Sequence, residues 1–395
     1  MPASRLTGRT LGLTVRDRTR FGAGALADLP EAVAEAGGAR AFVVTDPGVV
    51  ASGVAGRVVE RLEAAGVEAL LWPEVEPNPD QATVERGRAA LLAFGVDAAI
   101  VVAVGGGSSM DTAKAVSLAA ANRSVAVADL GYDKPSLRPG LPVIAVPTTA
   151  GTGAETNAFG VITDGSAGRK DYIGHPSLLP VVCILDPELT LGLPPGPTAA
   201  TGVDAMTHSL ESLLSANPNP FAEALALQVV RTVGAWLPVA VADGTDLVAR
   251  SELLFAAHLA GLGQASGTGV GAVHAIGHAM GTVGRLPHGT ALATVLPEVL
   301  ATYLDVRERE LGLVAAALGS ATISDAPGVA ARAGVDAVHR LLVAVGQRPT
   351  LADHGLGPAD ERRIVEDAVA DPAIRNSPRV PTAAEVAAIL ASVRG

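Results

Sequence analysis

The sequence predicts an α/β domain with a parallel sheet over residues 1–193, followed by an all-helical domain over residues 194–395. In the first half, short runs rich in valine and isoleucine alternate with helical patterns. That order is typical of parallel strands joined by helical crossovers. In the second half the strand patterns fade and long Ala/Leu-rich helical periodicity replaces them. A chain of 395 residues is long enough for two domains.

Four apolar runs are the expected strands of the sheet. They are continuous rather than alternating, as in parallel strands that are buried on both faces. The runs are AFVVTD (41–46), AAIVVAVGGG (98–107), LPVIAVPTT (141–149) and VVCILDP (181–187). Helices are expected to alternate with them, including 26–37 and 80–95. The domain boundary is expected near residues 190–198, in the Pro/Gly-rich stretch GLPPGPTAATG.

Composition excludes several classes of function. A net charge of −11 argues against a nucleic-acid partner, which needs a basic surface. The one cysteine, Cys183, cannot form a disulfide framework or a thiolate metal site within one chain. We find no signal-peptide pattern and no uninterrupted apolar stretch of about 18 residues. We therefore expect a cytoplasmic protein without a membrane partner.

A glycine-rich segment, GGGSSMDTAKAVSLAA (105–120), follows an expected strand and opens a helix. Glycines let a backbone approach a pyrophosphate closely, and a helix N-terminus attracts its negative charge. Gly105, Gly106, Gly107 and Ser108 fit this geometry. The segment matches neither GxGxxG nor the P-loop, so a glycine turn that serves only packing is the alternative.

Two other polar positions follow expected strands. The turn VPTTAGTGAET (146–156) offers hydroxyls where ligands bind in open α/β sheets, from Thr148, Thr149 and Thr152. Asp46 ends the AFVVTD run, where a carboxylate can accept a hydrogen bond from a ribose 2′-hydroxyl and repel a 2′-phosphate. That arrangement favours NAD over NADP. Ordinary turn chemistry is the alternative at both places.

Carboxylate and histidine side chains recur at helical spacing in the second half. Asp204 and His208 are four residues apart, as are His274 and His278, so each pair shares a helix face. His288 follows in a Pro-His-Gly turn. Such ligands suit a divalent first-row metal without any thiolate. The alternative is a set of packed core histidines, because the sequence does not show that the two segments meet.

With these motifs the chain resembles the iron-containing (group III) alcohol dehydrogenase family. The resemblance runs over nearly the whole chain, through FGAGALADL, VVTDPGV, EPNPD, GGGSSMDTAKA, VPTTAGTGAE, VITD, LDPELT, ATGVDAMTHSLE, HAIGH, PHG and NSPR. It implies a dehydroquinate synthase-like nucleotide domain, a helical metal domain, and an active site in the cleft between them. It also implies NAD(H) and Fe²⁺ as cofactors, with Zn²⁺ as the alternative metal, and a homodimer or larger homo-oligomer.

The resemblance assigns roles residue by residue. By matching position it implies that Asp204, His208, His274 and His288 bind the metal, and that His278 relays protons near the nicotinamide. It implies cofactor contacts from Asp46, Asn78, Gly106, Gly107, Ser108, Thr148, Thr149, Thr152 and Lys170, to which we add Gly105 and Asp111 of the glycine segment. The expected reaction is reversible hydride transfer, with the metal acting on the substrate oxygen.

The chain departs from the family pattern at several positions. Ala279 stands where proline is usual, and His175, which we expect to be exposed, replaces a small or acidic residue. Arg375 replaces a small or polar residue, and Gln264 and Ala265 stand where a bulkier apolar wall is common. Arg375 and the smaller wall lead to the hypothesis of a short polar or anionic aldehyde substrate, such as phosphonoacetaldehyde or succinic semialdehyde. A surface arginine in a general short-chain alcohol dehydrogenase is the alternative.

Other functions remain as alternatives. Dehydroquinate synthase-like enzymes, glycerol-1-phosphate dehydrogenases and maleylacetate reductase-like enzymes share the architecture, and a nucleotide-binding regulator is the non-catalytic option. VPTTAGTGAE and DAMTHSLES favour the alcohol dehydrogenase branch. The complete set of four candidate ligands argues against maleylacetate reductases and against an enzyme that has lost its metal.

Overall fold

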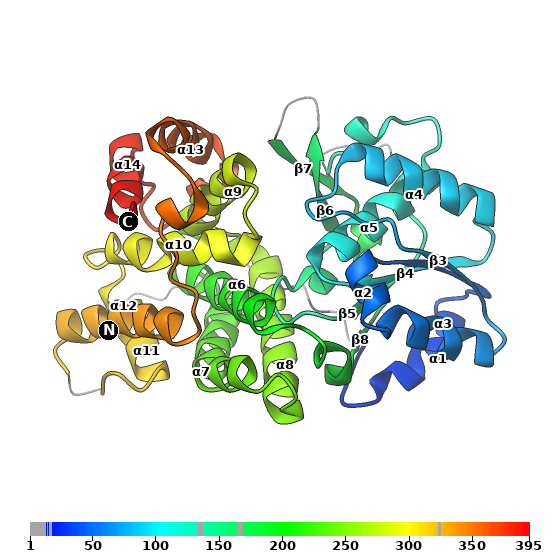
Figure 1. The fold of residues 1–395 in the computed structure, drawn as a ribbon, viewed down its shortest axis with the longest axis horizontal. Coiled ribbons are helices and arrows are strands. Elements are labelled where there is room, and N and C mark those ends of the chain that lie inside the picture. The colour runs from blue at the N-terminus through cyan, green and yellow to red at the C-terminus, as the bar shows by residue number, and fades with distance from the viewer. Residues whose placement is uncertain (1–12, 14, 16–17, 133–136, 165–168, 323–324) are drawn as a thin grey trace. The chain divides into compact units, whose positions relative to one another are not determined.

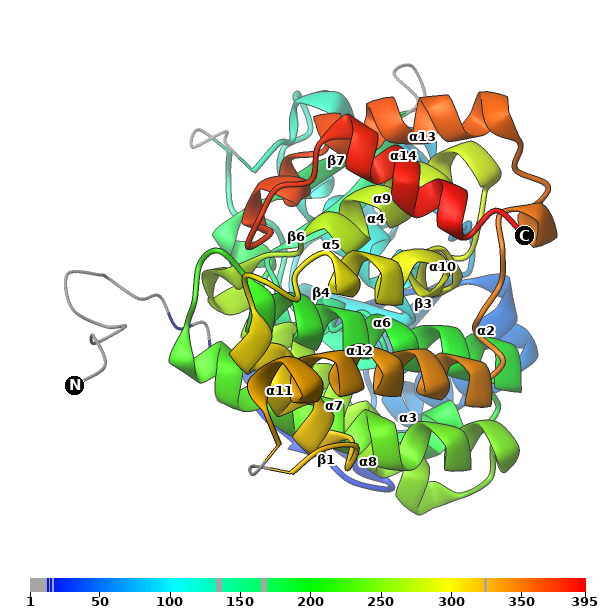
Figure 2. The ribbon, with the colours of Figure 1, turned by 90° about the vertical axis from the view of Figure 1, so that its left-hand side faces the viewer.

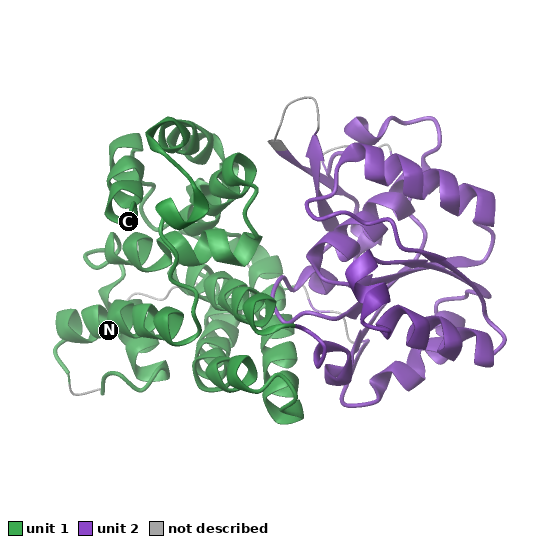
Figure 3. Ribbon diagram, viewed as in Figure 1, with its two compact units in different colours: residues 1–14, 194–395 green, residues 15–193 purple. Residues whose placement is uncertain are grey.

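The computed structural model describes residues 13, 15, 18–132, 137–164, 169–322 and 325–395. The chain divides into two compact units, and the division falls between Leu193 and Pro194 (Figure 3). Residues 15–193 make an α/β unit, and residues 194–395 make a helical unit.

The α/β unit is built on a six-stranded sheet in the order β1-β8-β5-β4-β2-β3, with every pair parallel (Figure 1). The prediction of a parallel sheet is confirmed. The four expected strands are the four interior strands, β2, β4, β5 and β8. The two edge strands, β1 and β3, were not expected. The strands are β1 (Thr19–Phe21), β2 (Arg40–Val44), β3 (Glu68–Trp72), β4 (Ala99–Gly105), β5 (Val143–Pro147) and β8 (Val182–Leu185).

Helices connect these strands, and a separate hairpin is inserted before β8. The hairpin strands β6 (Phe159–Asp164) and β7 (Arg169–Gly174) are antiparallel. The longer helices are α1 (Leu29–Glu35), α2 (Pro47–Ala51), α3 (Val54–Ala64), α4 (Gln81–Phe94) and α5 (Gly107–Ala121), and the short 3₁₀ turns are η1 (Ala25–Asp28), η2 (Val127–Asp129), η3 (Ala154–Thr156), η4 (Pro176–Leu178) and η5 (Pro187–Thr190).

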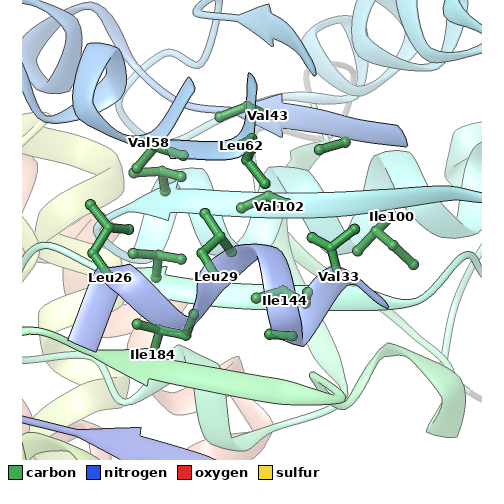
Figure 4. Close-up of a cluster of buried hydrophobic side chains, with 14 of the residues drawn as sticks. Leu26, Leu29, Val33, Val43, Val58, Leu62, Ile100, Val102, Ile144 and Ile184 are labelled. Carbon is green, nitrogen blue, oxygen red and sulfur yellow. The ribbon is translucent and has the colours of Figure 1, made fainter. Parts of the chain in front are cut away.

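The core of this unit follows from the alternation of side chains along each strand. On one face, Val43, Val102 and Ile144 pack with α1 and α3 side chains such as Leu29 (Figure 4). The next residue along β2, Phe42, points to the other face, where its ring lies 6.2 Å from the ring of Phe94 on α4. Because both faces are covered, the carboxyl ends of the strands are where polar side chains gather.

The helical unit contains no strand among its described residues, as expected. Its helices are α6 (Pro195–Leu214), α7 (Pro220–Ala242), α8 (Leu247–Gly263), α9 (Ala272–Gly284), α10 (His288–Ala301), α11 (Glu308–Ala317), α12 (Pro327–Ala344), α13 (Pro358–Ala370) and α14 (Ala383–Ser392), with short turns η6 (Gln264–Thr268), η7 (Ala352–His354) and η8 (Pro372–Asn376). α6 packs on α7 and α10, and α9 packs on α10, α13 and η8 (Figure 2). These contacts place α6, α9 and α10 around one another.

Capping residues fix where the helices of this unit begin. Asn219 accepts a hydrogen bond from the Phe221 amide, 3.0 Å away, at the start of α7. Asp246 does the same for α8, and Thr382 and Glu385 form a capping box on α14. Such caps satisfy backbone amides that the helix itself leaves unpaired.

α7 is the one described helix that is long and apolar enough to cross a membrane. Its most apolar 18-residue window has a mean hydropathy of 1.6. The core helix of a soluble protein meets the same criterion, and α7 packs on α6 and α8. Length and composition alone are therefore weak evidence for a membrane span.

Candidate functional site

The metal-ligand candidates of α6 lie side by side, as their spacing predicts. Asp204 and His208 are one helical turn apart and both are buried. The His208 Nε2 atom lies 3.7 Å from the Asp204 Oδ1 atom. One face of α6 therefore presents a carboxylate and an imidazole together.

The α9 candidate meets this face, which the sequence could not show. The Nε2 atom of His274 lies 3.7 Å from Asp204 Oδ1. Its ring stacks on the ring of His208, with centroids 4.7 Å apart and planes inclined by 19°. On the other side of the His274 ring, Nδ1 lies 2.6 Å from an oxygen of Glu211. Sequence reasoning missed Glu211.

His288, the first residue of α10, completes the group. Its Nε2 atom lies 3.5 Å from Asp204 Oδ1. The next residue, Gly289, explains this proximity: a Cβ atom there would lie 2.0 Å from the carbonyl oxygen of Ala200 on α6. Only glycine lets the start of α10 approach α6 so closely. Ligand atoms of Asp204, His274 and His288 all lie within 4.8 Å of one another.

The buried polar atoms of this group fit a divalent metal. Asp204 Oδ1 and His274 Nε2 are buried and have no hydrogen-bond partner in the structure. A buried polar atom without a partner is costly, and a cation bound between these two atoms would satisfy both. Burial raises the pKa of Asp204, but His208, His288 and His274 outweigh it and hold that pKa far below its usual value. A carboxylate oxygen and imidazole nitrogens suit Fe²⁺ or Zn²⁺.

His278 lies beside the group and has its own carboxylate partner. Its ring stacks on that of His288 at 5.5 Å between centroids. Its Nδ1 atom lies 2.8 Å from Asp371 Oδ2, a residue 93 positions later in the chain. Asp371 also caps η8 by accepting a hydrogen bond from the Ala373 amide. Sequence reasoning missed Asp371, whose only sequence pattern is that of a helix cap before proline.

The substrate candidates lie in the helical unit without a described link to the metal-ligand group. Arg375 is exposed on η8, and no hydrogen bond or ion pair joins its guanidinium to another described residue. Gln264 and Ala265 are half-buried in η6, a π-helical turn. Such turns often occur at functional sites. Ala279 is buried on α9.

His175 was expected to be exposed, and that expectation is wrong. The side chain is half-buried, and its Nδ1 atom accepts a hydrogen bond from the Ser177 amide at 3.1 Å. It caps η4, which explains a histidine at this place by local structure.

The nucleotide candidates of the α/β unit gather at one edge of the sheet. Strands β2, β4 and β5 are neighbours, and their carboxyl ends lead to Asp46, Gly105 and Thr148. The Thr148 amide donates to the Gly105 carbonyl oxygen over 3.0 Å. The Asp46 carboxylate caps α2 through two backbone amides and also accepts from Ser109 Oγ at 3.0 Å. It therefore initiates the turn, as one interpretation expected, and stays at the sheet edge.

The glycine segment and the threonine turn pack on each other. A Cβ atom on Gly107 would lie 2.8 Å from Thr152 Cγ2, and one on Gly106 would lie 3.2 Å from Thr149. Larger residues would push the two turns apart. Ser108 and Asp111 follow at the start of α5, and burial raises the pKa of Asp111 to about 6 against the opposing charge of Lys114.

Asn78 and Lys170 form a second group in the same unit. Thr163 of β6 pairs with Lys170 of β7 in the hairpin. The hydroxyl of Thr163 donates to the Asn78 carbonyl oxygen over 3.4 Å, and Asn78 has a left-handed backbone with φ 53°. No described contact joins this pair to Asp46.

Sequence reasoning also missed Lys114 of α5, which is fully buried. Its Nζ atom donates to the carbonyl oxygens of Ala154 and Phe159, at 2.6 and 2.8 Å, and to Asn157 Oδ1 at 2.7 Å. All three ammonium hydrogens are thus used to hold the segment Ala154–Phe159, which begins inside the threonine turn.

Comparisons with known proteins agree with this arrangement. The family model of iron-containing alcohol dehydrogenase matches residues 17–187, and that of the C-terminal part of the Fe-containing alcohol dehydrogenase family matches residues 198–393. The chain is 37% identical over 368 residues to "Probable alcohol dehydrogenase EutG" of Salmonella typhimurium, covering 93% of this chain and 91% of that protein.

Two solved structures are similar over almost their whole length. One is a 1,3-propanediol oxidoreductase, with a TM-score of 0.93 and 33% identity, covering 98% of this chain and 100% of that one. Another is the sulfoacetaldehyde reductase of Bifidobacterium kashiwanohense in complex with NAD⁺, with a TM-score of 0.86 and 28% identity, covering 97% and 98%. With both family models matched in order along the chain, the protein belongs to the iron-containing alcohol dehydrogenase family.

Proposed function

We propose that this oxidoreductase is a metal- and NAD(H)-dependent alcohol dehydrogenase or aldehyde reductase that acts on a short polar or anionic aldehyde. The observation that carries the metal assignment is the convergence of Asp204, His274 and His288, two of which have buried atoms without hydrogen-bond partners. His208, stacked on His274, is the fourth proposed ligand.

NAD(H) is supported by the edge of the parallel sheet. Gly106 and Gly107 let the threonine turn pack closely at the start of α5, where a helix N-terminus favours a pyrophosphate. The Asp46 carboxylate is held at the end of β2, where it would repel the 2′-phosphate of NADP. The similar sulfoacetaldehyde reductase was solved with NAD⁺. We assign the same cofactor here.

The chemistry divides between the bound groups and the chain. When bound, the metal supplies Lewis acidity at the substrate oxygen and the nicotinamide supplies or accepts the hydride. His278 handles the proton. Since its Nδ1 is engaged with Asp371, the opposite nitrogen, Nε2, is the atom that would give a proton to the product oxygen or take one from an alcohol.

Arg375 is the residue we propose for recognition of an anionic substrate. It lies on η8, which packs against α9, the helix of His274 and His278. Its guanidinium is exposed and is not engaged by any described acid. A similar structure is that of a reductase of sulfoacetaldehyde, an anionic aldehyde. The similarity to a 1,3-propanediol oxidoreductase favours the second candidate function, a dehydrogenase of neutral short-chain alcohols.

One assay separates these candidates. Protein loaded with Fe²⁺ under anaerobic conditions is screened for NADH oxidation against neutral and anionic short aldehydes. If the proposal is right, Arg375→Ala raises the KM for the anionic aldehydes about 10- to 100-fold, the worth of a charged hydrogen bond, and leaves neutral ones unchanged. The matched control is Arg362→Ala, an exposed arginine on α13. Equal KM values for wild type and Arg375→Ala would leave the neutral-alcohol function.

We further propose a cytoplasmic protein that forms a homodimer or a larger assembly. The buried Cys183 thiol, with no second cysteine in the chain, suits a reducing compartment. Sedimentation velocity on the metal-loaded protein tests the assembly, and a monomer at micromolar concentration would contradict it.

A further inference from the structure

A buried carboxylate stands behind the proposed metal ligands. Glu211 lies on α6, seven residues after Asp204 and three after His208. Residues spaced by three, four and seven share one face of a helix. The side chain is only 6% exposed, so its charge has to be satisfied by the protein.

Three donors surround the Glu211 carboxylate. Oε2 accepts from the Gly271 amide at 2.8 Å and lies 2.6 Å from His274 Nδ1, and Oε1 accepts from the Val273 amide at 2.7 Å. Backbone amides can only donate, so both oxygens act as acceptors. The short contact with His274 is therefore one in which Nδ1 carries the hydrogen.

This assignment determines what the other side of the imidazole can do. A neutral imidazole has one N–H, and placing it on Nδ1 leaves a lone pair on Nε2. That Nε2 atom points to Asp204, 3.7 Å away, and has no hydrogen-bond partner. The lone pair thus faces the place where the ligand atoms converge.

Capping of α9 alone does not account for Glu211. The two backbone amides at the start of α9 would satisfy a carboxylate without any histidine. The contact with His274 adds a constraint on ring orientation and on which nitrogen bears the hydrogen. Mutation of a carboxylate that accepts a hydrogen bond from a metal-binding histidine commonly weakens metal binding by about 10- to 100-fold.

We propose that Glu211 is a positioning residue, which holds His274 with its hydrogen on Nδ1 and aims Nε2 at the metal. The inference rests on the proposed metal site. Glu211→Gln tests it, because the amide has nearly the same shape but only one acceptor oxygen. Whichever way the amide turns, an NH₂ group faces at least one of the three donors. If it faces His274, the ring must accept at Nδ1 and carry its hydrogen on Nε2.

The readout is metal affinity, measured by competition of Zn²⁺ and Co²⁺ with a chromophoric chelator, together with the visible spectrum of the Co²⁺ protein. Glu361→Gln is the matched control. Glu361 is also buried, and it accepts two hydrogen bonds of 2.7 Å from Arg394 but contacts no histidine in the described structure. We expect Glu211→Gln to bind both metals 10- to 100-fold more weakly with an altered Co²⁺ spectrum, and Glu361→Gln to match wild type.

The possible outcomes distinguish the metal site itself from the positioning role of Glu211. Wild-type affinity and spectrum in both Glu211→Gln and Glu211→Met, which has no oxygen acceptor, would overturn the positioning role and leave the metal site intact. Failure of wild type to bind either metal would overturn the metal site and the inference with it. If Glu211→Gln does not fold, ¹⁵N-histidine NMR of Zn²⁺-loaded wild type decides, with the signal assigned by His274→Gln. A hydrogen on Nδ1 supports the inference, and one on Nε2 refutes it.

Discussion

Replacing Lys114 by methionine should destabilise the α/β unit, although it removes a buried charge. The Lys114 ammonium donates three hydrogen bonds, two of them to the backbone carbonyl oxygens of Ala154 and Phe159. Methionine has a similar length and no donor. The segment Ala154–Phe159 would then have three acceptors without their partner.

Two opposing effects set the magnitude. Each buried acceptor that loses its donor costs about 1–3 kcal/mol, so three cost about 6 kcal/mol at the middle of the range. Against this, burial lowers the pKa of Lys114 from 10.5 to about 8, opposed by Asp111 and Glu155. At about 1.4 kcal/mol per pKa unit, this shift means that burying the charged ammonium costs about 3 kcal/mol, a cost that methionine does not have. The net loss should be about 3 kcal/mol, or a Tm lower by roughly 6–12 °C.

Urea unfolding followed by circular dichroism measures this loss, with Arg61→Met, an exposed cation on α3, as control. The control should stay within about 0.5 kcal/mol of wild type. The lowered pKa of Lys114 also makes the stability of the unit depend on pH. Between pH 8 and 10.5 the unfolded chain holds a proton that folded Lys114 has released, so raising the pH stabilises wild type. The difference in free energy of unfolding between wild type and Lys114→Met should therefore increase from pH 8 to pH 10.5 and stay constant below pH 8. A loss in the free energy of unfolding below about 1 kcal/mol, or a difference from wild type that decreases as the pH rises, would refute the proposed role of the Lys114 hydrogen bonds.

Three other changes test the site. Asp371→Asn should retain metal and lower kcat about 10- to 100-fold, because the one amide oxygen of asparagine is used by the Ala373 amide and its NH₂ group then faces His278 Nδ1. Steady-state kinetics with metal analysis measures both effects. Gly289→Ala should lose about 2–4 kcal/mol of stability and part of its bound metal, since its Cβ would meet the Ala200 carbonyl oxygen; an unchanged melting curve would contradict the close approach. Asp46→Gly should lower the preference for NADH over NADPH about tenfold, the equivalent of about 1.4 kcal/mol of lost repulsion, and equal kcat/KM ratios in both proteins would argue against the ribose contact.

The fold was predictable where burial is complete. Strands β2, β4, β5 and β8 are almost wholly buried, so their sequences are continuous apolar runs. The edge strands lack that pattern: β1 has only three residues, and β3 alternates between exposed and covered positions until Trp72. The β6–β7 hairpin carries charges at both ends, at Asp164 and Lys170, and reads as a loop.

In the candidate site, residues that are neighbours along one helix were predictable, and residues that meet only through tertiary packing were not. Helical spacing places Asp204 beside His208, and an application of the same rule seven residues on would have found Glu211. Lys114 lies inside the glycine segment, yet its acceptors extend from the turn η3 to the first residue of β6, a stretch that no periodicity describes. Asp371 could be found only from the packing of η8 on α9.

His274 and His278, one turn apart on α9, each contact a carboxylate from a different part of the helical unit. Glu211 reaches His274 from α6, so the orientation of that ring depends on the packing of α6 against the start of α9. Asp371 reaches His278 from the end of α13, so that ring depends on the seating of η8, where Ile374 is buried. A change that loosens only η8 should therefore impair proton transfer while metal binding persists. A change that loosens α6 from α9 should remove the metal first, and with it every later step.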